Sequence, residues 1–388
     1  MATQKVSDTL IDSFPSSKLT GALPVIDGSA ITGAGDSVTK SASDPAIDTN
    51  PSGGVSHVWV NTTSGEIYSC TDATAGANVW TNVGPGTGNI EPYTYQGTQY
   101  GYSFGGHIPS TDDIQRYSFV SDGNATNIGD RGIFAPSHTS TSSDTHGYVM
   151  GGAVGPTVVN NIHKFSFSAS IGLTATDIGN LTVARRWLAG CSSVGYGWSV
   201  GGGTTNGAGS EVNTIDRISH TTDSDATDWA DLYSASRMGS SSSSTDYGYK
   251  AGMGYPHNNI IQRFPFATQT TSSDVGDLAI ASGAHGGTSS TTHGYTLGAG
   301  EGPIGNYIQK YAFASSGNST DIANLLGNLW EMSCSSSTTH GYSAQGSNGG
   351  GGHAVNTIQK HSFSADTDAV DVGDTTVATN YTGLGCQV

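Results

Sequence analysis

A glycine followed by an aromatic residue recurs along the chain at nearly even intervals, and this periodicity is the strongest constraint on the fold. The pairs are Gly101-Tyr102, Gly147-Tyr148, Gly197-Trp198, Gly248-Tyr249, Gly294-Tyr295 and Gly341-Tyr342. Successive glycines are 46, 50, 51, 46 and 47 residues apart. Such an interval holds four short strands with their turns, and it is too long for a leucine-rich or ankyrin repeat. The sequence therefore predicts six copies of one four-stranded unit.

Each copy contains the same series of strand-like segments. A segment of small residues, such as GCSSV at 190–194, precedes the strand with the Gly-aromatic pair. After a variable loop come a strand such as NIHKFSF at 161–167 and a last segment such as TDIGNL at 176–181. Alternation at period two is typical of strands, and we name these segments strands A, B, C and D. The B to C distance varies between copies, as expected for surface loops on a fixed frame.

The units resemble kelch repeats. Strand B ends in a glycine pair in the first three units, at Gly105-Gly106, Gly151-Gly152 and Gly201-Gly202. The position of the kelch tryptophan in strand D holds Ile128, Ile178, Trp229, Val275, Ile322 and Val372. The resemblance implies an all-β protein in which residues 98–388 form a six-bladed kelch-like β-propeller. Since a single unit keeps the tryptophan, the repeats are divergent and kelch ligand residues are not transferred to this chain.

The C-terminal residues are expected to close the ring of sheets. The last segment, TGLGCQV at 382–388, matches strand A of the other units and ends where another Gly-aromatic pair would begin. An unpaired strand edge is a template for aggregation, so the first sheet needs an inner strand. Residues Leu384–Val388 are expected to supply it. The alternative is that Tyr93–Gly97 supply it and the tail is surplus.

The N-terminal quarter differs from the repeats. Residues 1–33 have Pro and Gly interruptions and no sustained period, which indicates an extended attachment or assembly segment. Residues 34–86 contain alternating segments separated by the turns TTSGE and TAGAN, which predict a small β module. Residues 87–97 are expected to be a linker to the propeller at 98–388.

Two N-terminal stretches are similar to virion proteins of tailed bacteriophages, particularly phages of marine bacteria. They are KLTGALPVIDGSAITG at 18–33 and HVWVNTTSGEIYSCTDATAGANVWTNVG at 57–84. Repeats of the HGYVMGG and NTIQKHSF type resemble the distal parts of such proteins. The resemblance implies a tail fibre or fibre-like virion structural protein, made in the host cytoplasm and then part of the particle. Its N-terminal segment would join other virion proteins, with a homotrimer as one expected state, and its propeller would bind a host-surface receptor, a glycan or a protein.

Composition and charge exclude several classes of partner. A net charge of -17 disfavours nucleic acid, because phosphate binding needs a concentrated Lys and Arg surface. No run approaches the roughly 20 apolar residues of a spanning helix, so membrane insertion is not expected. The cysteines Cys70, Cys191, Cys334 and Cys386 lack metal-site spacing, so free thiols are expected. No cofactor or metal is predicted.

Positive charges divide into scaffold and candidate site residues. One basic residue lies two positions after the strand C isoleucine in every unit: Arg116, Lys164, Arg217, Arg263, Lys310 and Lys360. Their expected partners are the strand D aspartates of the same unit, Asp177, Asp228, Asp274, Asp321 and Asp371, with Asn127 as the exception in the first unit. Other arginines and several aromatics cluster between strands D and A. The predicted receptor-binding residues are Phe134, Arg185, Arg186, Trp187, Arg237, Trp330 and Tyr381.

Arginine and aromatic side chains are the types that dominate binding energies, and aromatic faces stack on sugar rings. For each aromatic the alternative is packing between neighbouring sheets. No GxSxG, Walker or HExxH pattern is present, and an acidic chain offers too many carboxylate pairs to select a catalytic one. A non-enzyme without catalytic residues is therefore predicted. Two alternatives stay open, a propeller-fold polysaccharide-degrading enzyme and a cytoplasmic kelch-type protein-binding adaptor.

Overall fold

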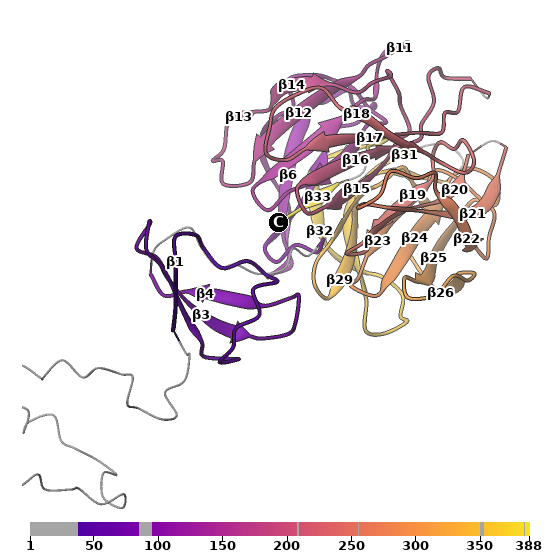
Figure 1. The fold of residues 1–388 in the computed structure, drawn as a ribbon. Coiled ribbons are helices and arrows are strands. Elements are labelled where there is room, and N and C mark those ends of the chain that lie inside the picture. The colour runs from indigo at the N-terminus through magenta and orange to yellow at the C-terminus, as the bar shows by residue number, and fades with distance from the viewer. Residues whose placement is uncertain (1–37, 85–94, 208, 255, 350–352, 384) are drawn as a thin grey trace, which may run out of the picture. The chain divides into compact units, whose positions relative to one another are not determined.

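The computed structural model describes residues 38–84 and 95–388, except 208, 255, 350–352 and 384 (Figure 1). These residues form strands, turns and bends without a helix, which confirms the predicted all-β class. The described part of the chain accordingly has no helix long and apolar enough to span a membrane. The chain divides into two compact units, Met1–Pro92 and Tyr93–Val388. The predicted attachment segment at 1–33 lies outside the described residues.

The first unit contains one four-stranded sheet. Its strands, in order, are β1 (Val38–Ser41), β2 (Val58–Asn61), β3 (Ile67–Asp72) and β4 (Val79–Asn82). The pair β1 and β2 is parallel, and the other pairs are antiparallel. Tyr68, Cys70 and Trp80 form its core. Strands therefore flank the turns TTSGE and TAGAN, as the alternation predicts.

Six sheets of the second unit share one order, in which four strands that follow one another in the repeat lie side by side and antiparallel. Sheet 1 holds β33 (Cys386–Gln387), β5 (Tyr100–Phe104), β6 (Asp113–Ser118) and β7 (Thr126–Asp130). Sheet 2 holds β8 (Thr139–Ser142), β9 (His146–Met150), β12 (Asn161–Ser166) and β14 (Thr176–Asn180). Sheet 3 holds β15 (Ala189–Ser193), β16 (Tyr196–Val200), β17 (Thr214–Ser219) and β18 (Thr227–Asp231).

The last three sheets repeat this order. Sheet 4 holds β19 (Ser240–Ser243), β20 (Tyr247–Met253), β21 (Asn258–Pro265) and β22 (Ser273–Asp277). Sheet 5 holds β23 (Gly286–Ser289), β24 (His293–Ala299), β25 (Gly305–Ala312) and β26 (Thr320–Asn324). Sheet 6 holds β28 (Ser333–Ser336), β29 (His340–Ala344), β31 (His353–Ser362) and β32 (Val370–Thr379). The short strands are β10 (Ala153–Val154), β11 (Thr157–Val158), β13 (Leu173–Thr174), β27 (Leu329–Trp330) and β30 (Ser347–Asn348).

The core of this unit lies between neighbouring sheets. The aromatic of each Gly-aromatic pair packs on rings at the end of strand C of the following sheet or directly after it, as Tyr295 of sheet 5 stacks on Phe363 of sheet 6 with ring centres 5.0 Å apart. Tyr342 of sheet 6 packs in the same way on Phe119 of sheet 1, at 4.7 Å. Aromatic pairs at such distances add to the energy of burial. The first and last sheets are therefore packed together like any other neighbours.

Strand A of each of the six sheets, which we call the inner strands, takes part in a closed circuit of hydrogen bonds. In each sheet, a backbone N–H near the end of strand A donates to a side-chain oxygen of strand A in the next sheet. The donor and acceptor residues are Ser142 to Ser192 (2.9 Å), Ser192 to Ser243 (3.1 Å), Ser243 to Ser289 (2.9 Å), Ser289 to Ser336 (2.9 Å), Ser336 to Gln387 (3.3 Å) and Gln387 to Ser142 (3.0 Å). Small residues in strand A allow the inner strands to approach closely enough for this circuit.

The C-terminal strand completes sheet 1, as predicted. Cys386 lies opposite Tyr102, and Gln387 lies opposite Gly101, in an antiparallel pair of β33 with β5. Residue 384, where the predicted segment begins, lies outside the described residues. The cysteines of strand A are free and buried, and so is Cys70.

Residues 95–97, predicted to belong to a linker, lie instead against the ends of the inner strands. The Gln96 side chain donates to the Ser289 carbonyl (2.9 Å), and the Gly97 N–H donates to the Ser336 carbonyl (2.8 Å). A Cβ at Gly97 would lie 2.7 Å from the Val388 carbonyl oxygen, so the close approach requires glycine. Residues 95–97 thus pack against the end of the inner strands where strand A finishes.

The basic residues of strand C do not make the predicted pairs within their own sheets. The three lysines bond to aspartates of the following sheet, as Lys164 Nζ lies 2.8 Å from Asp223 and Lys360 Nζ lies 2.6 Å from Asp122 of sheet 1. The three arginines stack on tyrosines, as Arg116 does 4.6 Å from the Tyr100 ring centre. Three of the strand D aspartates instead accept a local backbone N–H group, and Asn127 does the same in sheet 1; the aspartates are Asp177, Asp274 and Asp371.

Candidate functional site

Six residues with positive φ lie immediately before the inner strands, one in each sheet, and we call them the mouth ring. They are Ser137 (59°), Trp187 (56°), Met238 (54°), Ala284 (62°), Glu331 (48°) and Tyr381 (51°). Residues with a side chain rarely adopt this conformation, which costs about 1–3 kcal/mol at each position. Its recurrence at equivalent positions means that the surrounding sheets impose it.

Backbone hydrogen bonds connect the mouth ring from one sheet to the next. The N–H groups and the carbonyls that accept from them are Ser137 and Tyr381 (3.0 Å), Trp187 and Ser137 (2.7 Å), Met238 and Trp187 (3.0 Å), Ala284 and Met238 (2.6 Å), and Glu331 and Ala284 (3.0 Å). The Thr382 hydroxyl closes the ring by donating to the Glu331 carbonyl (2.6 Å). The backbone is thus the same at six positions whose side chains all differ. A constant frame that presents variable side chains is typical of binding sites.

A cavity of about 30 Å³ opens inside the mouth ring. Ser137, Trp187, Met238, Ala284 and Glu331 line it, together with His138, His285 and Thr382. This space accommodates roughly one or two water molecules or a hydroxyl-bearing group of similar size.

Glu331 is the acidic group of this cavity. Glu331 is 7% exposed, and neither of its carboxyl oxygens makes a hydrogen bond of normal geometry with the described residues. Burial raises the pKa of Glu331 to about 8; the Arg186 charge and the Trp187 indole oppose this rise, and Glu301 adds to it. A buried carboxyl that makes no hydrogen bond of normal geometry is costly, so its presence requires an explanation.

We call the mouth ring, together with the side chains that surround it, the mouth. Its positively charged side consists of two arginines that stack on one tryptophan. The Arg186 guanidinium lies 3.7 Å from the Trp187 ring centre, and that of Arg237 lies 4.9 Å from it. Arg237 also forms an ion pair with Glu211 at 2.9 Å. Arg186 donates to the Ser137 hydroxyl at 3.0 Å. These contacts hold the three predicted site residues Arg186, Trp187 and Arg237 together.

The aromatic side of the mouth contains the other predicted residues. Trp330 and Tyr381 meet edge to face with ring centres 5.3 Å apart, and His107 lies 5.8 Å from Tyr381. Phe134 lies 6.4 Å from His107. Phe134, Tyr381 and Trp330 are half-buried, so each combines packing with an exposed portion.

Arg185 does not belong to this surface. It is 0% exposed and forms an ion pair with Asp216 of the next sheet at 2.6 Å. The same guanidinium donates to the carbonyls of Gly201 (2.7 Å) and Thr214 (2.9 Å). Since its partners are all internal, Arg185 joins sheets 2 and 3 and has no atom that a receptor could contact.

Glu331, Met238, Ser137 and His107 belong to the mouth but escaped the sequence-based selection, which considered only arginines and aromatics. A positional signal identifies most of them. Five mouth-ring residues lie ten positions before the glycine of a Gly-aromatic pair, as Ser137 precedes Gly147 and Glu331 precedes Gly341. Aligning the units on that glycine therefore finds the ring without a structure. His107 comes from a variable loop and has no such signal.

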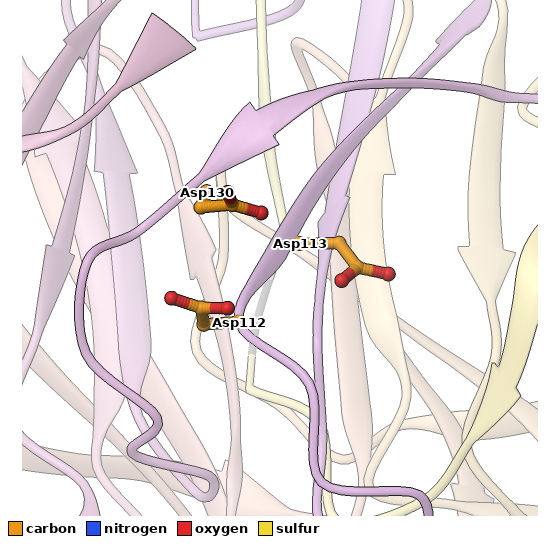
Figure 2. Close-up of side chains that lie close together, drawn as sticks. All are labelled: Asp112, Asp113 and Asp130. Atoms are coloured by element: carbon orange, nitrogen blue, oxygen red, sulfur yellow. The ribbon is translucent and has the colours of Figure 1, made fainter. Parts of the chain in front are cut away.

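An acidic cluster lies where the start of β6 pairs with the end of β7 (Figure 2). Carboxyl oxygens of Asp112, Asp113 and Asp130 lie within 4.8 Å of one another. Burial raises the pKa of Asp113, with Asp130 and Asp112 adding to the rise and Arg131 opposing it. Because the buried Arg131 cation already offsets this negative charge, we assign the cluster no ligand.

No known protein-family model matches the chain, and no curated protein matches it.

Proposed function

We propose that residues 98–388 form a six-bladed kelch-like β-propeller. Six sheets with one strand order, inner strands that contact one another in succession, and two hydrogen-bond circuits that return to sheet 1 all support this architecture. Radial packing of four-stranded sheets is the arrangement that such repeats adopt. In this architecture the mouth ring surrounds one opening of the central channel.

We further propose that the protein is a tail fibre or fibre-like virion component of a bacteriophage that binds a host-surface receptor, with a glycan as the expected class. The single observation on which the binding role depends is the mouth ring, with its constant backbone and variable side chains. Residues 95–97 of the second unit pack at the opposite end of the inner strands from the mouth ring, beside Ser289 and Ser336. The N-terminal segment would join the particle.

Two measurements test this proposal. Mass spectrometry of purified phage particles is expected to find the protein as a structural component, and its absence from particles would support the adaptor alternative instead. Fluorescently labelled full-length chain is expected to bind host cells, and Trp187→Ala with Trp330→Ala is expected to weaken binding about tenfold or more. Tyr233→Ala, an exposed aromatic from the same kind of loop that does not line the cavity, serves as control.

One observation favours polysaccharide degradation as a second candidate. A carboxyl whose pKa burial raises to about 8, as at Glu331, holds a proton at neutral pH, as a general acid must. Incubation of the purified chain with host polysaccharide distinguishes the candidates. Release of reducing ends that Glu331→Gln abolishes would identify an enzyme, whereas binding without product supports the receptor role.

A further inference from the structure

The fold does not require a carboxyl group at position 331. The other mouth-ring positions hold serine, tryptophan, methionine, alanine and tyrosine on the same backbone. Glu331 is nevertheless more than nine-tenths buried and lines the cavity, and among the described residues neither carboxyl oxygen makes a hydrogen bond of normal geometry, although the Trp187 indole lies close enough to lower its pKa. A buried polar group that packing does not need and that the protein does not satisfy is complementary to a ligand.

The charges around the cavity favour an uncharged ligand. Arg186 and Arg237 stack on Trp187, and the charge of Glu301 adds to the rise in the pKa of Glu331. An acidic sugar would meet the Glu301 carboxyl group, whose charge already opposes ionisation of Glu331, and an amine would meet the two guanidinium groups. Hydroxyl groups avoid both conflicts, because each one donates and accepts. They can donate to the Glu331 carboxyl and accept from the Trp187 indole N–H, which also lacks a partner of normal geometry in the described chain.

The size of the cavity determines which part of a glycan can enter. About 30 Å³ accommodates a hydroxyl or hydroxymethyl group but not a sugar ring. The ring must remain outside, where Tyr381 and Trp330 present half-buried aromatic surfaces to its C–H groups. The arrangement therefore suits the end of a saccharide chain better than its middle.

We infer that the mouth binds the uncharged terminal hexose of a glycan, with its hydroxyl groups in the cavity against Glu331 and Trp187 and its ring against Tyr381. This inference rests on the proposed receptor-binding function and adds the class of sugar and the group that recognises it.

A glycan array with three classes of chain end tests the inference on the full-length protein. The classes are neutral hexoses, uronic or sialic acids, and sugars with free amines. The wild type is expected to bind glycans that end in a neutral hexose. Glu331→Leu, which removes hydrogen bonding at similar volume, is expected to weaken binding about tenfold or more, and Glu331→Gln to retain it within about threefold. Melting curves check that the variants are folded, and Tyr233→Ala is the control.

Binding only to acidic or amine-bearing ends would overturn the inference, as would unchanged binding by folded Glu331→Leu. Cell binding by the same proteins separates this failure from a failure of the proposed function. A chain that binds host cells but no neutral glycan contradicts the sugar class alone. A chain that binds neither cells nor any glycan contradicts the receptor-binding function as well.

Discussion

The type of cation in strand C depends on the residue before the Gly-aromatic pair of the same sheet. Where the residue before the Gly-aromatic pair is tyrosine, the strand C cation is arginine, which stacks on it, as Arg263 does at 4.6 Å from Tyr247. Where that residue is histidine, the cation is lysine, and the next sheet offers an aspartate. The histidine, lysine and aspartate sets are His146, Lys164 and Asp223; His293, Lys310 and Asp366; and His340, Lys360 and Asp122. The third set connects sheet 6 to sheet 1.

The sequence reveals these cations as a repeated slot but not their partners. Asp122 and Lys360 are 238 positions apart, so their contact becomes visible only once the order of the sheets is known. The same limit explains why Arg185 was predicted to bind a receptor. It lies between strands D and A, as Arg186 and Arg237 do, but its partner is Asp216 of the next sheet. Residue type suggested a binding role where the three-dimensional position shows a structural one.

Glu331 makes stability depend on pH. Its folded-state pKa of about 8 exceeds its ordinary value of 4.5, so the folded protein retains a proton that the unfolded chain releases between these values. The contribution of Glu331 to stability must therefore fall as pH rises from about 4.5 through 8. Arg186, Glu301 and Tyr381 surround the carboxyl, and His285 in the same cavity has a pKa of about 3 and is neutral in this range.

Glu331→Gln is accordingly expected to melt at the same temperature as the wild type at pH 4 and at a higher temperature at pH 9. Thermal melting across this range measures the difference. If the melting temperatures of the variant and the wild type differed equally at pH 4 and pH 9, the carboxyl of Glu331 would not be protonated as assigned.

Lys250 gives the opposite pH dependence. It is 0% exposed, and its Nζ has no hydrogen-bond partner among the described residues. Burial lowers its pKa from 10.5 to about 7, with Cys191 opposing the shift, so its contribution to stability improves as pH rises from about 7 through 10.5. Lys250→Met is expected to stabilise the protein by about 1–4 kcal/mol at pH 6 and by less at pH 10. Urea unfolding measures the change in stability at each pH. A variant less stable than the wild type at pH 6 would contradict an unfavourable burial of the Lys250 cation.

The strands of each sheet correspond closely to those predicted, because small residues in strand A and alternation in strand C are local signals. Strand A of sheet 3 was expected at 190–194 and is Ala189–Ser193, and strand D of sheet 2 was expected at 176–181 and is Thr176–Asn180. Contacts of Gly97 with a chain end nearly three hundred residues away leave no local trace. The predicted linker therefore extended too far.

The glycine of the Gly-aromatic pair is explained by contact between sheets. A Cβ at Gly294 would lie 2.5 Å from Ser242 Oγ of sheet 4 and 2.5 Å from Tyr311 Cζ of its own sheet. Gly294→Ala is expected to destabilise the protein by about 1–3 kcal/mol in urea unfolding. Gly317→Ala is the matched control, because no atom lies within 4 Å of its added Cβ. Equal stability of the two variants would show that the close packing is not needed.

At the scale of the whole molecule, contacts between sheets 6 and 1 repeat those between other neighbours. Gln115 of sheet 1 accepts from the Thr376 N–H at 2.7 Å, just as Gln262 accepts from the Ser234 N–H at 2.8 Å. The pairing of β33 with β5 brings together the first and last strands of the second unit. Repetition in the sequence predicted the number of units, and the match of the tail to strand A predicted how the first one is completed.

Removal of residues 385–388 tests the importance of this closure. The truncated chain would expose the edge of β5 and lose the contacts of the buried Cys386. We expect a loss of about 3 kcal/mol or more, or aggregation, measured by urea unfolding and size-exclusion chromatography. A monomeric truncated chain with unchanged stability would show that the last strand is dispensable.

The most direct test of the whole account is an experimental structure of the full-length chain in complex with the glycan that binds best on the array. We predict six sheets around one channel and a terminal hexose whose hydroxyl groups contact the Glu331 carboxyl. A sugar bound on another surface, or a different number of sheets around the channel, would contradict it.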